Sequence, residues 1–62
     1  MKLSAGFICE LYVDHGYIQD LDNNKYLFMF NDIVGEFLLH DKVTFSVKKD
    51  VIDIAFNVRV VK

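Results

Sequence analysis

Apolar residues recur at every second position along much of this 62-residue chain, and that period of two most constrains its fold. Alternate side chains of a β-strand point to opposite faces, whereas an α-helix needs a period near 3.6. In the clearest run, Ile52, Ile54, Phe56, Val58 and Val60 alternate with Asp53, Ala55, Asn57 and Arg59. This pattern predicts a half-buried antiparallel strand with the first set facing the core. No segment offers ten residues of helical periodicity, so we expect an all-β fold.

Four further segments have the composition and alternation of strands. They are residues 6–13, 17–20, 25–30 and 42–48. Turns are predicted at Asp14-His15-Gly16 and at Asp22-Asn23-Asn24, because Asn, Asp and Gly tolerate left-handed dihedral angles and Asn and Asp bond their own backbone.

Residues 31–41 are predicted to be irregular. Asn31 or Asp32 could cap a single helical turn, and Gly35-Glu36 would then lie in a loop. Five strands at spacings near 8–12 residues indicate a small antiparallel barrel, since closure removes exposed strand edges. An open three-plus-two sandwich is the alternative. The length fits one domain spanning residues 1–62.

The predicted strand at residues 25–30 is apolar on both faces. Tyr26, Phe28 and Phe30 would point one way, and Leu27 and Met29 the other. A domain of this size normally has one core, so one face of this strand should meet water. An exposed apolar face is either a ligand-binding surface or a contact with a partner protein.

Composition argues against several other classes of function. Cys9 is the one cysteine, and His15 and His40 are isolated, so we expect no disulfide, no metal site and no catalytic centre. We expect no signal peptide and no membrane span, and hence a cytoplasmic protein. Residues 1–31 carry two lysines against four carboxylates, whereas residues 32–62 balance five against five, which leaves a net charge of −2.

Four segments also carry recognisable motifs: His15-Gly16-Tyr17-Ile18, Tyr26-Leu27-Phe28-Met29-Phe30, His40-Asp41-Lys42-Val43-Thr44-Phe45-Ser46-Val47 and Ala55-Phe56-Asn57-Val58-Arg59-Val60-Val61. The glycine of the first segment lies ten positions after Gly6. Over about residues 5–61, these four segments resemble motifs of the cold-shock domain, an oligonucleotide-binding (OB) barrel. In the same order, the family motifs are Lys-Gly-Phe-Gly-Phe-Ile, Val-Phe-Val-His-Phe, Gly-Asp-x-Val-x-Phe-x-Val and Ala-x-Asn-Val-x-Val. The last segment is the most specific match, and the first is two residues short.

This resemblance implies a function. In the cold-shock domain family, single-stranded RNA or DNA lies across the outer face of the first three strands, where bases stack on aromatic side chains. Carried over position by position, the resemblance implies a nucleic-acid-binding site at Tyr12, His15, Tyr17, Lys25, Leu27, Met29, Phe30 and Phe37. It implies no cofactor and no enzymatic activity. The missing two residues leave open whether Tyr17 faces this surface.

The chain departs from the family mainly at that surface. Cys9-Glu10 stands where the family has Lys-Trp, Leu27 replaces a phenylalanine, and Met29 replaces a histidine. With fewer rings and fewer cations, we expect only weak binding of single-stranded nucleic acid, by stacking. The alternative is a protein-interaction module or homodimer that uses Leu27, Met29 and Phe30 and has lost nucleic-acid binding.

Overall fold

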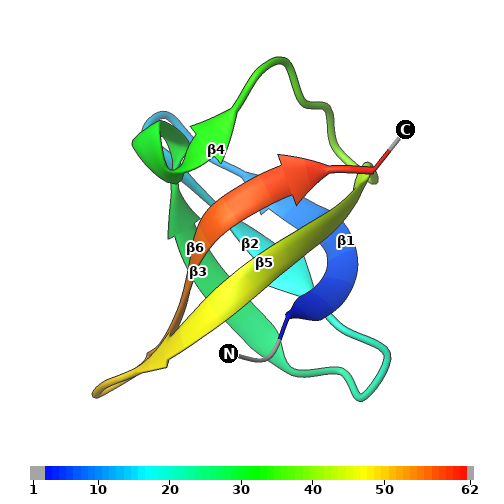
Figure 1. Cartoon of the computed structure of the whole chain (residues 1–62). Helices are drawn as coiled ribbons and strands as arrows, with labels where there is room; N and C mark the ends of the chain where they lie inside the picture. The colour runs from blue at the N-terminus through cyan, green and yellow to red at the C-terminus, as the bar shows by residue number, and fades with distance from the viewer. Residues whose placement is uncertain (1–2, 62) are drawn as a thin grey trace.

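The computed structural model describes residues 3–61, which form a closed β-barrel (Figure 1). The elements are β1 (Ser4–Leu11), β2 (His15–Gln19), β3 (Lys25–Met29), the 3-10 turn η1 (Phe30–Asp32), β4 (Ile33–Val34), β5 (Lys42–Lys49) and β6 (Asp53–Val60). The strands neighbour one another in the order β3-β2-β1-β5-β6-β4, and an added β3–β6 pairing closes the barrel. The prediction of a small all-β barrel is therefore confirmed, with five strands forming the barrel and β4 as a short sixth strand.

The sheet is mixed, so the prediction of a purely antiparallel barrel is wrong in two places. Leu27 of β3 pairs with Ile54 of β6 in parallel orientation, and β4 also runs parallel to β6, with Ile33 opposite Val58. The other pairings are antiparallel. The strands β3 and β4 run in the same direction as β6. The pairings by which β6 closes the barrel are therefore parallel.

The segment predicted to be irregular contains one helical turn and a two-residue strand. The turn η1 follows Met29, whose side chain makes no capping hydrogen bond, and Asn31 and Asp32 lie inside the turn instead of capping it. The strand β4 was not predicted, because two residues are too few to show alternation. From Gly35, with φ of 86°, the chain enters the loop that leads to β5, as expected.

The two predicted turns differ in outcome. His15 and Gly16 already belong to β2, so the turn predicted to include them is wrong, and the bend lies at Val13 and Asp14. The turn between β2 and β3 is confirmed, and Asn23 there has φ of 66°.

The Asp20 carboxylate organises the β2–β3 turn. Its Oδ1 accepts hydrogen bonds from the backbone N–H groups of Asp22 and Asn24, each at 2.9 Å, and its Oδ2 accepts one from the Tyr26 hydroxyl at 2.9 Å. Desolvation acts to raise the pKa of Asp20, but these hydrogen bonds favour the charged form and together hold the pKa below its usual value.

Because the pKa of Asp20 is lower in the folded than in the unfolded chain, its contribution to stability is present above the unfolded pKa near 4 and is lost as pH falls through the folded value. We expect Asp20→Asn to lower the thermal midpoint at pH 7 and to flatten its decline below about pH 4. Melting curves followed by circular dichroism between pH 2 and 7 measure both effects. Equal pH dependence in the two proteins would contradict this role of Asp20.

The core lies inside the barrel and draws on every strand. It consists of Ile8, Ile18, Tyr26, Phe28, Ile33, Val43, Phe45, Ala55 and Val58. The predicted facing of β3 is confirmed, since Tyr26 and Phe28 are buried, Leu27 is half-buried and Met29 is exposed. Phe30 does not continue the strand; it lies in η1 and packs against the edge of the core.

Two irregularities interrupt the alternation. In β1, Ile8 pairs with Ile18 but Glu10 pairs with Tyr17, which makes Cys9 an extra residue in a β-bulge. In β6, the pairing with β5 shifts near Asn57, whose φ is 51°. Ala55 and Val58 are therefore the buried residues of β6. The predicted inward set is wrong in its first half: Ile54 and Phe56 are half-buried, and Ile52, 52% exposed, precedes the strand. It is confirmed in its second half, where Val58 is buried and Val60 packs against the core.

Candidate functional site

The outer face of β1, β2 and β3 carries most of the predicted site residues. Gly16 and Ile18 of β2 are buried, so Tyr17 between them faces outward, which resolves its orientation. Glu10, Tyr17 and Leu27 lie opposite one another across the three strands. The β1 bulge is what places Glu10 on this face, because strict alternation from the buried Ile8 would have turned it inward.

Three rings form a cluster at one end of this face, which we call the ring cluster: Tyr12, His15 and Tyr17. The rings of Tyr12 and His15 are stacked, with centroids 4.9 Å apart and an interplanar angle of 17°. Tyr17 meets both rings edge-on, at 6.1 Å from Tyr12 and 5.7 Å from His15. Edge-on and stacked contacts at these distances are favourable and hold the rings in place. Tyr12 remains 50% exposed, so the cluster is accessible.

A hydrogen-bonded network adjoins the ring cluster. The Glu10 carboxylate accepts a hydrogen bond from the Tyr12 hydroxyl at 2.6 Å and one from the Lys25 ammonium at 2.8 Å. Both bonds, that from Lys25 first, hold the pKa of Glu10 below its ordinary value, and the same carboxylate raises the pKa of Lys25 and of Tyr12. The network therefore contains an ionised carboxylate at neutral pH.

The Asp14 carboxylate lies beside the ring cluster. Its Oδ1 is 2.7 Å from Nδ1 of His15. That hydrogen bond lowers the pKa of Asp14, so this end of the face carries a second negative charge. Asp14 and Glu10 thus each hydrogen-bond a ring of the cluster, Asp14 that of His15 and Glu10 that of Tyr12.

Apolar side chains complete the outer face. Met29 lies opposite His15, and Leu27 lies opposite Tyr17. On β1, Phe7 is exposed between the buried Gly6 and Ile8 and lies opposite Gln19. The resemblance had not included Phe7, although its outward position follows from simple alternation.

Phe30 and Phe37, the remaining predicted site residues, form a separate pair. Their ring centroids lie 5.2 Å apart, and both contact the buried ring of Phe28. The backbone N–H of Phe30 donates to the Asp14 carbonyl at 3.2 Å, so this pair borders the β1–β2 bend. Their half-buried rings pack on the core at the end of the barrel, and no ring contact joins them to Tyr12, His15 or Tyr17 in the described chain.

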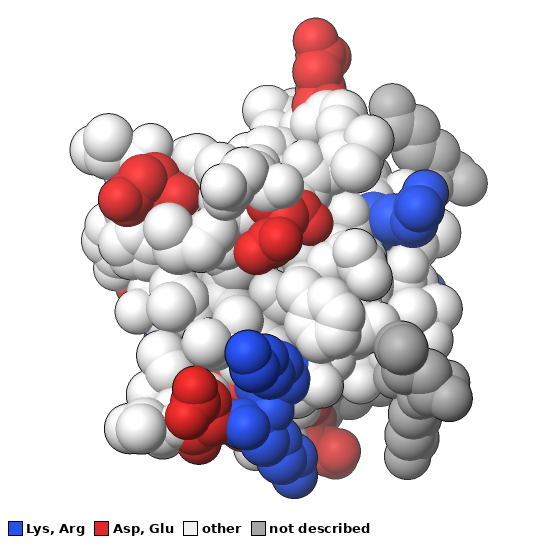
Figure 2. Space-filling model, turned by 60° about the vertical axis from the view of Figure 1, so that its left-hand side comes forward, with Lys and Arg blue, Asp and Glu red and all other residues white. Residues whose placement is uncertain are grey.

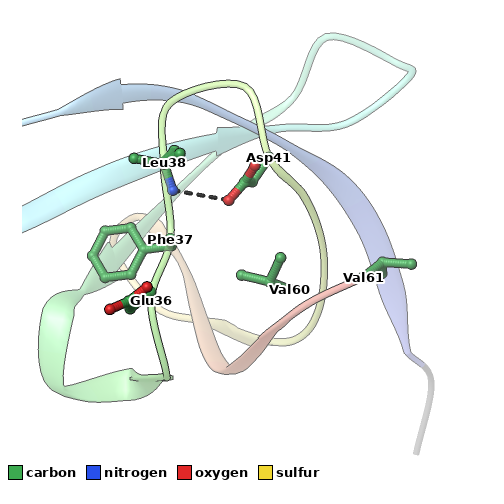
Figure 3. Close-up of a pocket in the computed structure, with 6 residues that line it drawn as sticks. All are labelled: Glu36, Phe37, Leu38, Asp41, Val60 and Val61. Atoms are coloured by element: carbon green, nitrogen blue, oxygen red, sulfur yellow. Dashed lines mark hydrogen bonds between the residues drawn. The ribbon is translucent and has the colours of Figure 1, made fainter.

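A shallow hollow of about 610 Å³ lies under the loop that precedes β5 (Figure 3). It is lined by Glu36, Phe37, Leu38, Asp41, Val60 and Val61. Asp41 is engaged within it, because its Oδ2 accepts a hydrogen bond from the Leu38 N–H at 2.9 Å. The hollow shares only Phe37 with the predicted site.

Charge on the molecule is mixed and leans acidic. Figure 2 shows a largely uncharged face with acidic side chains across its upper half, a basic patch at its upper right, and further basic groups at its lower end beside acidic ones. Within β1–β3 the only lysine is Lys25, and there is no arginine. Between residues 3 and 61, no cluster of His, Cys, Asp and Glu could hold a metal ion. Over the same residues, no helix has the length and hydropathy to cross a membrane.

Sequence comparisons identify no relative: no family model matches the chain, and no curated protein matches it. The fold does have a solved counterpart. The structure of Drosophila Unr CSD456 superposes with a TM-score of 0.89 at 20% sequence identity, covering 98% of this chain and 27% of that one. The chain therefore spans about a quarter of the length of its structural neighbour. With the barrel topology described above, this similarity shows that the chain has the fold of a cold-shock domain.

Proposed function

We propose that the outer face of β1–β3 binds single-stranded RNA or DNA, weakly and mainly by base stacking. The observation that carries the proposal is the ring cluster of Tyr12, His15 and Tyr17, held in mutual contact on an accessible face of the barrel. The cold-shock-domain fold supports it, because the motif resemblance implies bases at this face. The apolar side chains of Leu27 and Met29 would continue the surface beneath the next base.

The physical balance favours stacking over phosphate contact. A base stacked on an aromatic ring contributes about 1–3 kcal/mol, and every base has such a face, so sequence preference is modest. The electrostatic attraction to phosphates comes from lysine and arginine. Here Lys25 is paired with Glu10, and Asp14 adds a second carboxylate at the ring cluster. The rings therefore supply the affinity, and the charges limit it.

Fluorescence anisotropy of labelled oligo-dT and oligo-U at low salt tests the proposal. We expect saturable binding, and no competition from a duplex of equal length, because paired bases cannot leave their own stack to meet the rings. No saturable binding below about 0.1 mM, the weak end of non-specific affinities, would contradict it.

A second function, protein binding or self-association, is supported by the exposed apolar side chains on the same face. Met29 is 38% exposed and Phe7 is 44% exposed. Sedimentation over a concentration series distinguishes the two functions. A protein that stays monomeric at every concentration would remove the self-association version.

Met29→Lys separates the functions in one variant. A lysine there would place a charge inside an apolar contact and break a dimer, yet it would add a cation beside the ring cluster. For nucleic acid we expect tighter binding and a steeper slope of log affinity against log salt concentration. The change in slope should be about 0.7, the value for one added phosphate contact on a single strand. Val51→Lys adds the same charge at an exposed residue of the β5–β6 turn and serves as the control. Equal oligonucleotide affinity in the two variants would argue against a ligand crossing Met29.

A further inference from the structure

Lys25 is the only basic residue of β1–β3 other than His15, and its ammonium is already engaged. Its Cα lies opposite Gln19 on β2, whereas Glu10 lies opposite Tyr17. The Lys25 side chain therefore crosses β2 diagonally to reach the Glu10 carboxylate on β1. It ends 2.8 Å from Oε2, and both side chains keep solvent access, at 54% and 37% exposure.

The same carboxylate also fixes a ring of the proposed stacking surface. Glu10 Oε1 accepts the Tyr12 hydroxyl proton at 2.6 Å, and the Tyr12 ring stacks on His15. One carboxylate thus joins the cation of β3 to the ring cluster, whose Tyr12 directly follows β1. An exposed ion pair contributes little to folding stability, so stability gives no strong reason for this arrangement.

We propose that Glu10 determines the binding mode of this face: it occupies Lys25 and orients Tyr12, so that nucleic acid binds through its bases with little or no phosphate contact. This inference rests on the proposed function and specifies how that function works. A phosphate that approaches the Lys25 ammonium also meets the paired Glu10 carboxylate, which offsets the charge of the lysine and repels the phosphate. Binding by the unmodified protein therefore depends only weakly on salt, unlike that of proteins that release many counterions.

The inference makes Glu10 a brake on affinity. Glu10→Gln removes the negative charge, keeps a hydrogen-bonding side chain of the same length for Tyr12, and leaves Lys25 available to a phosphate. We expect tighter binding of oligo-dT at low salt. One phosphate contact steepens the slope of log affinity against log salt by about 0.7, which is about a 2.6-fold greater loss of affinity between 50 and 200 mM salt.

Two further variants control the experiment. Asp50→Asn makes the same change in net charge in the β5–β6 turn, and asparagine can still accept the Val51 N–H that Asp50 Oδ1 accepts at 2.9 Å. We expect it to leave the slope unchanged. The double variant Glu10→Gln/Lys25→Met has the net charge of the original protein but no cation to release, and its slope should return to the original value.

Anisotropy titrations of all four proteins from 50 to 200 mM KCl decide between the outcomes. Tighter, more salt-dependent binding in Glu10→Gln alone supports the inference. Binding detected only in Glu10→Gln would retain Glu10 as a brake on affinity but overturn the proposed function, and with it the base-only binding mode of the unmodified protein. Equal affinity and slope in the original protein and Glu10→Gln overturn the role of Glu10 and leave stacking intact. No binding by any variant overturns both proposals. The double variant keeps the test decisive, because a gain that persists without Lys25 would also overturn the inference.

Discussion

Replacing Tyr12 and Tyr17 with alanine is expected to abolish measurable binding of single-stranded oligonucleotides. Each ring that stacks a base contributes about 1–3 kcal/mol, which is about 5- to 150-fold in affinity. The two rings contact each other, so their effects need not add. Starting from weak binding, the loss of either ring alone should be readily seen by anisotropy.

Phenylalanine variants supply the matched control. Tyr12→Phe and Tyr17→Phe retain the π-face, and we expect them to bind within a few-fold of the original protein. Tyr12 is exposed and Tyr17 is half-buried on the outer face, so neither alanine variant opens the core, and far-ultraviolet circular dichroism should remain unchanged. Full oligonucleotide affinity in the double alanine variant would contradict stacking on the ring cluster.

The second large expected effect is on stability. A Cβ at Gly16 would lie 2.7 Å from the Glu10 carbonyl oxygen and 2.8 Å from the Phe28 ring. Both neighbours are held, one by the β1 bulge and the other by the core, so neither can easily move aside. Overpacking of this kind typically costs about 1–3 kcal/mol. In a domain of this size we expect Gly16→Ala to lower the thermal midpoint by about 4–24 °C.

Gly35→Ala provides the comparison. Nothing lies within 4 Å of a Cβ there, and only the positive φ of 86° opposes the substitution. Its cost should be about 1–2 kcal/mol, without any effect on the β1–β2 contact. Thermal unfolding of both variants by circular dichroism is the measurement. A Gly16→Ala protein that melts within about 2 °C of the original would show that β1 and Phe28 are free to shift.

Much of the fold could be predicted because most strands keep their alternation. Tyr26 and Phe28 face the core and Leu27 and Met29 face away, as the pattern of β3 predicts. The predictions fail where one residue is inserted into a strand. The residue Asn57, with φ of 51°, reverses the alternation within β6, and a strictly periodic reading cannot detect that.

The candidate site was predictable residue by residue but not as an assembly. The resemblance named Tyr12, His15 and Tyr17 separately, whereas their contact with one another follows from the pairing of β1 and β2, which the bulge at Cys9 sets. Alternation alone would have placed Glu10 beside Ile8 in the core. A buried glutamate without a partner would be costly, and this conflict is the one sequence signal for a bulge. Predicting the Glu10–Lys25 ion pair requires the registers of β1, β2 and β3 relative to one another. The alternation pattern within one strand does not contain that information.

A nuclear magnetic resonance titration of the ¹⁵N-labelled protein with oligo-dT tests the central claim most directly, because it locates the ligand as well as detecting it. We predict that the largest shift changes fall on the backbone amides of Tyr12, Tyr17 and Met29, while the β5–β6 hairpin stays unchanged. No change at about 0.1 mM ligand and protein, or changes centred on the hollow beside Phe37 and Val60, would contradict nucleic-acid binding on the outer face of β1–β3.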